Sequence, residues 1–185
     1  GDFPTCPYPN PEIRQALEVG LKVAKEVGAD ILIATDPDCD RVGIAVKQGD
    51  DFRLFSGNEV GVLLTDFIAK RKVAMGVMPK NPVLVKTIVT TDLAKRVADD
   101  YGIETRDVLT GFKYIGDQIA GLEKDGEVDR YLLGFEESYG YLSGSYVRDK
   151  DAVNGAYLIA QMFAYYKAQN KSLLDVLNGL YEKYG

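Results

Sequence analysis

From residue 56 onward, short apolar segments alternate with longer segments of helical periodicity, and this alternation constrains the fold more than any other feature. Strands that alternate with helices favour a largely parallel sheet covered by helices. We therefore predict the α/β class, with α/β layers around a mainly parallel mixed sheet. The predicted strands are 82–89, 103–109 and 130–135, and the predicted helices are 58–72, 91–101, 112–122, 152–168 and 172–183. The helix at 58–72 is expected to be amphipathic, with one apolar face.

Residues 1–55 follow a different pattern. Four of the seven prolines lie within residues 1–11, which predicts an extended arm because proline fixes φ and lacks a backbone donor. A helix over 12–27 and a strand over 30–35, buried on both faces, are expected next. The remaining segments, 42–47 and 52–55, flank a turn and predict a β-hairpin. We place a domain boundary near residue 56, so that 1–55 and 56–185 belong to two domains.

The composition excludes several classes of function. The chain has 185 residues, a net charge of −6, two cysteines and no histidine. The acidic balance argues against a nucleic-acid or membrane partner held by bulk charge. The missing histidine excludes a Ser-His-Asp triad and histidine-ligated metals. Cys6 and Cys39 have no metal-site spacing and indicate unpaired thiols in a cytoplasmic protein. The first residue is not methionine, so we expect a piece of a longer protein.

Asp36-Pro-Asp-Cys-Asp-Arg41 follows the apolar strand 30–35 and is the strongest chemical motif. Three carboxylates this close repel one another unless a hard cation lies between them. We predict that Asp36, Asp38 and Asp40 bind Mg²⁺. An exposed acidic turn is the alternative, whereas an EF-hand fails because Arg41 stands where that loop needs glycine. The guanidinium of Arg41 would hold a phosphate oxygen or pair with one of the aspartates.

Two further motifs lie near the end of the strand 130–135. Gly134-Phe-Glu-Glu-Ser-Tyr-Gly140 offers carboxylates and a hydroxyl between glycines, which suits sugar hydroxyls, although a turn with one solvated glutamate fits equally well. Tyr146-Val-Arg-Asp-Lys-Asp151 is either a solvated helix start capped by Asp149 or Asp151, or a site. In the second case Arg148 would contact phosphate or sugar, and Lys150 would transfer a proton if its pKa were depressed.

Weaker signals lie at two other strand ends. Thr110-Gly-Phe-Lys113 joins a strand to a helix, where backbone N–H groups and Lys113 could meet an anion. Lys86 lies at the end of the strand 82–89. Loops of this kind can converge on one edge of an α/β sheet.

Together these motifs resemble the α-D-phosphohexomutase superfamily, and most closely its bacterial phosphoglucomutase-like branch. Residues 36–41 match the family's magnesium loop, DPDxDR, and residues 134–140 are similar to its sugar loop, GEESxG or GEMSGH. The resemblance covers essentially the whole chain and implies phosphohexomutase-type α/β layers. Phe135, in place of the commoner glycine, favours the phosphoglucomutase or phosphopentomutase-like branch.

The resemblance also implies roles for individual residues. Asp36, Asp38 and Asp40 would bind Mg²⁺, and Lys150 would be the acid–base lysine, with Lys113 as the second candidate. The phosphosugar, namely glucose 1-phosphate, glucose 6-phosphate or their bisphosphate, would be bound by residues from several loops. These residues are Arg41, Lys86, Thr110, Gly111, Glu136, Ser138 and Arg148.

The family's phosphoserine motif, TASHNP-like, and its phosphate loop, RxSGTEP-like, do not occur in this sequence. The resemblance therefore implies the end of domain 2 (1–55) and domain 3 (56–185), without domains 1 and 4. We expect the 185-residue chain to be inactive, because the phosphate relay is missing. The alternatives are a phosphomannomutase or phosphopentomutase, a non-catalytic module that binds a sugar phosphate or cation, and a phosphatase with an aspartate nucleophile.

Overall fold

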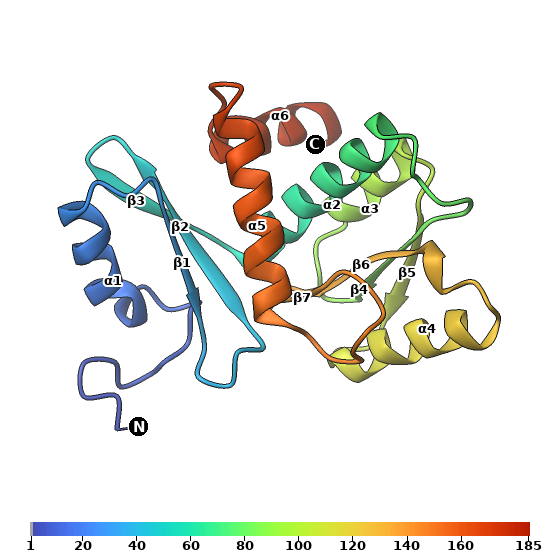
Figure 1. Ribbon diagram of the computed structural model, residues 1–185, viewed down its shortest axis with the longest axis horizontal. Helices are drawn as coiled ribbons and strands as arrows, with labels where there is room; N and C mark the ends of the chain where they lie inside the picture. Colours follow the sequence, from blue (N-terminus) through green and yellow to red (C-terminus); the bar gives the residue numbers. More distant parts are fainter. Residues whose placement is uncertain (1) are drawn as a thin grey trace.

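Two β-sheets organise the chain in the computed structural model, which describes residues 2–185 (Figure 1). The first is antiparallel, in the order β1 (Ile31–Thr35), β2 (Val42–Gln48), β3 (Asp51–Phe55). The second has the order β5 (Glu104–Val108), β4 (Val83–Thr87), β6 (Tyr131–Glu136), β7 (Gly140–Leu142). In it β4 is parallel to β5 and β6, and β7 is antiparallel to β6. The predicted α/β class with a mainly parallel mixed sheet is confirmed, although the sequence did not indicate β7.

Residues 2–185 form six α-helices, and each begins and ends within two residues of its predicted segment. They are α1 (Arg14–Glu26), α2 (Gly57–Ala74), α3 (Leu93–Asp100), α4 (Phe112–Lys124), α5 (Ala152–Lys167) and α6 (Leu173–Tyr184). A short 3₁₀ helix, η1 (Val128–Arg130), precedes β6. Polar caps fix three of the helix starts: the hydroxyls of Ser56 and Ser172 accept from the N3 backbone, and Asp151 accepts from two N–H groups of α5.

Helix α5 lies between the two sheets and joins them into one body (Figure 1). Apolar side chains of β2 and β3 share a core with α2, α3, α5, α6 and one face of the second sheet. The other face of the second sheet is covered by α4, and α1 covers the outer face of the first sheet. Both predicted domains therefore contribute to the largest core, since Val42 and Phe55 pack in it with residues such as Leu63 and Ile159.

Three local expectations are wrong. Strand β1 is not buried on both faces: it pairs with β2 at the edge of its sheet, and its first four residues are only half-buried. Helix α2 is not amphipathic, because neighbours on several sides bury every residue from Val60 to Ala69. Within residues 2–11 the arm forms turns rather than an extended segment, and Pro11 is buried against Gly43. Among the described residues, no helix is long and apolar enough to cross a bilayer.

Candidate active site

The loop between β1 and β2 brings its three aspartates together. One carboxylate oxygen from each of Asp36, Asp38 and Asp40 lies within 4.8 Å of the other two. Asp36 is buried, Asp40 is half-buried and Asp38 is exposed. We call residues 36–41 the acidic loop. It therefore presents a convergent set of oxygen ligands that is open to solvent on the side of Asp38.

Asp36 holds this loop in shape. Its Oδ1 accepts hydrogen bonds from the backbone N–H groups of Asp40 (3.1 Å) and Arg41 (3.0 Å), and its Oδ2 accepts from Arg41 Nε at 2.7 Å. Burial alone would raise the pKa of Asp36, but these hydrogen bonds lower it to about 2. Asp36 is therefore ionised at neutral pH and pairs with Arg41 inside the loop.

Lys150 reaches the acidic loop from the segment before α5. Its Nζ lies 2.7 Å from Asp40 Oδ2 and 3.3 Å from Asp149 Oδ1. Burial alone would lower the pKa of Lys150, but these two carboxylates raise it. Lys150 is thus protonated in this arrangement, which suits a proton donor rather than a base.

The donor set of the acidic loop fits a hard divalent cation. Carboxylate oxygens are the ligands that Mg²⁺ and Ca²⁺ prefer, and Mg²⁺ takes only a few of them beside water or phosphate oxygens. Burial, followed by the neighbouring Asp36, raises the pKa of Asp40 against the opposing effect of Lys150. This shift is the expected sign of crowded carboxylates whose charges are only partly offset by Arg41 and Lys150.

The segment Glu136–Tyr139, here called the sugar loop, joins β6 to β7. Glu136 is buried, and its Oε1 accepts a hydrogen bond of 2.9 Å from the backbone N–H of Gly111, at the start of α4. Burial raises the pKa of Glu136. Ser138 is half-buried two residues further on. The structure therefore brings the predicted residues Glu136 and Gly111 into direct contact.

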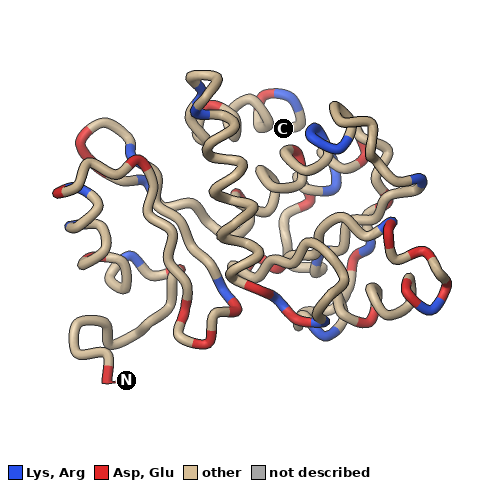
Figure 2. Tube along the Cα trace, in the orientation of Figure 1, with Lys and Arg blue, Asp and Glu red and all other residues tan. Residues whose placement is uncertain are grey.

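Backbone hydrogen bonds join the acidic loop, the sugar loop and the start of α5. The carbonyl of Tyr139 accepts from Val42 N at 3.0 Å, and the carbonyl of Cys39 accepts from Ala152 N at 3.1 Å. Both residues whose carbonyls accept these bonds have left-handed backbones, with φ of 67° at Tyr139 and 60° at Cys39. Figure 2 shows the acidic loop beside the alternating acidic and basic segment that precedes α5. These contacts bring the acidic loop together with two segments that lie roughly 100 residues further along the sequence.

Three of the remaining predicted residues, Lys86, Lys113 and Arg148, contact groups outside the acidic loop and the sugar loop. Lys113 is exposed at the start of α4, with its Nζ 4.8 Å from the ring centre of Tyr114, and Thr110 is exposed beside it. The guanidinium of Arg148 pairs with Glu123 on α4. Lys86 is buried, with a side chain only 1% exposed, and its Nζ lies 2.8 Å from Asp107 Oδ1 and 3.3 Å from Asp92 Oδ1.

Sequence reasoning missed two acidic residues near the site. Glu12 precedes α1, and its Oε1 lies 3.6 Å from Arg41 NH1, so the residue that follows the N-terminal arm contacts the acidic loop. Glu137 accepts hydrogen bonds from Thr87, the last residue of β4, and from Thr90 in the loop after it. The position of Glu137 beside Glu136 was the available signal, whereas nothing local pointed to Glu12.

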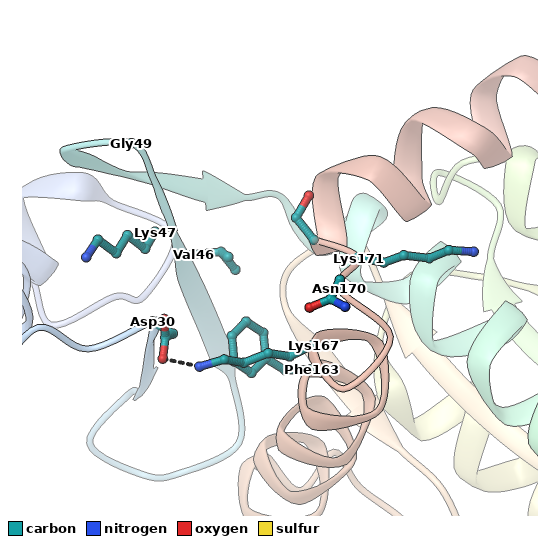
Figure 3. Close-up of a pocket in the computed structure, with 9 residues that line it drawn as sticks. Asp30, Val46, Lys47, Gly49, Phe163, Lys167, Asn170 and Lys171 are labelled. Carbon is teal, nitrogen blue, oxygen red and sulfur yellow. Dashed lines mark hydrogen bonds and ion pairs between the residues drawn. The ribbon is translucent and has the colours of Figure 1, made fainter.

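A separate pocket of about 520 Å³ lies at the other end of α5, between Phe163 and the end of β2 (Figure 3). Lys167 pairs there with Asp30, which precedes β1 and so lies at the end of the first sheet opposite to the acidic loop. The side chains of Lys47 and Lys171 point away from each other in Figure 3. Divergent ammonium groups do not form an anion site, so the pocket adds nothing to the candidate active site.

The chain is similar to known proteins over its full length. Residues 56–184 match the family model "Phosphoglucomutase/phosphomannomutase, alpha/beta/alpha domain III", and residues 1–49 match that of domain II. Over its full length the chain is 39% identical to a phosphoglucomutase of Staphylococcus saprophyticus, 37% to a phosphomannomutase of Mycoplasmoides pirum and 36% to a probable phosphoribomutase of Schizosaccharomyces pombe. It covers 33%, 33% and 31% of these relatives, respectively.

A solved structure of a phosphoglucomutase/phosphomannomutase family protein from Burkholderia thailandensis has the same fold, with a TM-score of 0.69 at 19% identity. The match covers 93% of this chain and 33% of that one. The chain thus spans about a third of the length of the curated relatives it matches. From the two family-model matches and the identities to these relatives, the chain belongs to the phosphoglucomutase/phosphomannomutase family of the α-D-phosphohexomutase superfamily.

Proposed function

We propose that this chain supplies the metal-binding and sugar-binding loops of an enzyme that interconverts hexose 1-phosphate and hexose 6-phosphate through a bisphosphate intermediate. The observation that carries the proposal is the approach of Lys150 Nζ to within 2.7 Å of Asp40 Oδ2. It puts a protonated lysine beside three convergent carboxylates. A phosphoryl-transfer site needs this combination of a cation site and a proton donor, because charge builds on the phosphate oxygens while a hydroxyl is displaced.

In this proposal Asp36, Asp38 and Asp40 hold Mg²⁺, which would offset charge on the transferring phosphoryl group when bound. Arg41 binds the phosphosugar through those N–H groups of its guanidinium that do not donate to Asp36. When a phosphoryl group passes from the bisphosphate to the serine of the longer protein, Lys150 would donate a proton to the departing sugar oxygen. Lys113 is the second candidate for that step.

The hexose lies against the sugar loop in the same proposal. Glu136 and Ser138 accept and donate hydrogen bonds to its hydroxyls. The backbone at Thr110 and Gly111 and the side chain of Arg148 bind its phosphate end. Lys86 supports the substrate site through the loop after β4, because its buried ammonium donates to the carbonyl of Thr90 in that loop.

Glucose phosphates are the substrates that we favour, because the Glu-Glu-Ser form of residues 136–138 is typical of glucose-type mutases. Mannose and pentose phosphates are the alternatives, and the relatives include proteins named for all three sugars. A cytoplasmic location is part of the proposal, and both cysteines are free, as expected of a reducing compartment.

The proposal assigns residues 1–55 to the end of a second domain and residues 56–185 to a third, in a longer polypeptide that carries the phosphoserine and the phosphate-binding loop. A 185-residue chain that lacks these parts is expected to have no mutase activity. It is also expected to bind Mg²⁺ weakly, because a phosphoserine oxygen is one of the ligands that complete the site.

A coupled assay tests this proposal. The longer protein that contains this chain is assayed with glucose 1-phosphate, mannose 1-phosphate and ribose 1-phosphate, with and without Mg²⁺. We expect Mg²⁺-dependent turnover that Asp38→Asn reduces at least a hundredfold, and no turnover by the 185-residue chain. Full activity in EDTA, or normal turnover by the 185-residue chain, would contradict the proposal.

A further inference from the structure

The two adjacent glutamates of the sugar loop reach different neighbours. Glu136 accepts from Gly111 N in the loop after β5, whereas Glu137 contacts Thr87 at the end of β4 and Thr90 in the loop after it. The strand order β5-β4-β6 places these loops in a row along one edge of the sheet. The sugar loop is thus fixed at two adjacent residues, on one side through Glu136 and on the other through Glu137. Only Glu136 belongs to the substrate site proposed above.

Glu137 closes a triangle of hydrogen-bonding oxygens. Its Oε2 lies 3.1 Å from Thr87 Oγ1 and 3.1 Å from Thr90 Oγ1, and the two hydroxyl oxygens are 2.7 Å apart. Both threonines are buried. Each hydroxyl has one hydrogen to donate, so Glu137 Oε2 accepts at least one hydrogen bond and both hydroxyls have a partner. Removing the carboxylate would leave a buried hydroxyl without its acceptor.

The loop after β4, which carries Thr90, is also fixed to the second sheet by Lys86. The buried ammonium of Lys86 donates to the carbonyl of Thr90 at 3.0 Å and pairs with Asp107 of β5 at 2.8 Å. The loop after β4 is therefore tied to the second sheet on one side and to Glu137 on the other. A support fixed in this way can hold a binding loop in place, which is how substrate-binding groups are preorganised.

We propose that Glu137 is a positioning residue, which acts through Thr87 and Thr90 to hold Glu136 and Ser138 in the geometry that binds the sugar hydroxyls. This inference rests on the proposed function for its consequence in catalysis. It assigns Glu137 no contact with substrate or metal. Its effect should therefore fall on the KM for the phosphosugar rather than on the affinity for Mg²⁺.

A double-mutant cycle in the longer protein tests the inference. The variants are Glu137→Ala, the pair Thr87→Val with Thr90→Val, and all three together. We expect each of the first two to raise the KM about tenfold, with unchanged Mg²⁺ dependence, and the combined variant to be no worse than either alone. Additive effects, or a KM equal to that of the wild type in both, would overturn the inference. Glu182→Gln, an exposed change on α6, is the control that should leave the kinetics unchanged.

Amide hydrogen exchange on the 185-residue chain gives a second readout that needs no activity. Glu137→Ala and the threonine pair should each accelerate exchange at Ser138–Gly140 about tenfold, while exchange in α6 stays as in the wild type. Unchanged exchange in the sugar loop would refute the anchoring role. If the wild-type longer protein isomerises none of the three sugar phosphates, the proposed function fails, and the exchange result still decides whether Glu137 anchors the loop.

Discussion

The ammonium of Lys150 lies 2.7 Å from Oδ2 of Asp40, so the candidate proton donor and a candidate metal ligand form an ion pair. The pair connects the segment before α5 to the loop after β1, which are more than 100 residues apart in the sequence. Lys150 therefore offsets part of the acidic charge that would otherwise attract a divalent cation. Lysine and cation compete for the same carboxylate.

The first prediction concerns this competition. Lys150→Gln should tighten divalent cation binding to the 185-residue chain about fivefold, because loss of a nearby positive charge is worth about 1 kcal/mol at a water-accessible site. The same change should abolish turnover in the longer protein. Calorimetric titration with Mg²⁺ measures the affinity, and Lys22→Gln on the exposed face of α1 is the matched control. Weaker cation binding by Lys150→Gln would show that the lysine supports the metal site instead.

The second prediction separates two aspartates of the acidic loop. Asp38 is exposed, so Asp38→Asn should weaken Mg²⁺ binding at least tenfold and leave the thermal unfolding temperature unchanged. Asp36 is buried and accepts three hydrogen bonds, so Asp36→Asn should also destabilise the fold, by about 2 kcal/mol. Equal losses of stability in the two variants would contradict this division of roles.

The third prediction follows from the pKa of Asp36, which is lowered from 3.8 to about 2. A carboxyl whose pKa is depressed in the fold contributes stability above pH 3.8, and that contribution is lost as the pH falls toward 2. The stability difference between the wild type and Asp36→Asn should therefore be constant from pH 7 to 5 and shrink below pH 4. Urea unfolding of both proteins across this range measures it. A difference that stays the same down to pH 2.5 would rule out this linkage.

How much of this site the sequence could predict depends on how local each contact is. The three aspartates of the acidic loop lie within five residues, so their convergence follows from a short turn. The edge position of β1 and the burial of α2 on all sides from Val60 to Ala69 depend on which elements pack beside them, and periodicity alone carries no such information. The burial of Lys86 likewise depends on its neighbours, because it is paired with Asp107 of the adjacent strand β5, and its position in the sequence near a strand end did not predict this.

The short strand β7 shows another limit of sequence reasoning. Its three residues, Gly140–Leu142, are too few to display a period, and they pair with β6 through the turn at Tyr139. That turn places Tyr139 in the left-handed backbone region, which residues other than glycine seldom adopt. The sugar loop was therefore recognisable as a motif, whereas its anchoring by β7 and by Glu137 emerged only from the three-dimensional arrangement.

The fourth prediction concerns Cys39, whose left-handed backbone directs its carbonyl to Ala152 N. A β-branched residue tolerates this conformation poorly, so Cys39→Val should lower the free energy of unfolding by about 1–2 kcal/mol and weaken Mg²⁺ binding. Cys39→Gly adopts the same backbone freely and should keep the wild-type Mg²⁺ affinity. The two variants are compared by calorimetry and urea unfolding. Equal Mg²⁺ affinities in both would mean that this backbone geometry does not shape the metal site.

The fifth prediction contrasts function with stability at Glu136. Burial raises the pKa of Glu136, because the buried surroundings penalise its negative charge. Glu136→Gln keeps an acceptor for Gly111 N and removes the buried charge, so the unfolding temperature should stay the same or rise. Binding of glucose 1-phosphate to the longer protein should weaken at least tenfold. A lower unfolding temperature with unchanged sugar binding would reverse the interpretation of this residue.

The central claim is that the acidic loop, the sugar loop and the segment before α5 form one cation and phosphosugar site. Paramagnetic broadening by Mn²⁺, measured on the ¹⁵N-labelled 185-residue chain, tests it most directly. The account predicts that low Mn²⁺ broadens the amides of Asp36–Arg41, Glu136–Tyr139 and Lys150 together, spares α6, and has no such effect in Asp38→Asn. Broadening that leaves the sugar loop and Lys150 untouched, or that persists in Asp38→Asn, would contradict the claim.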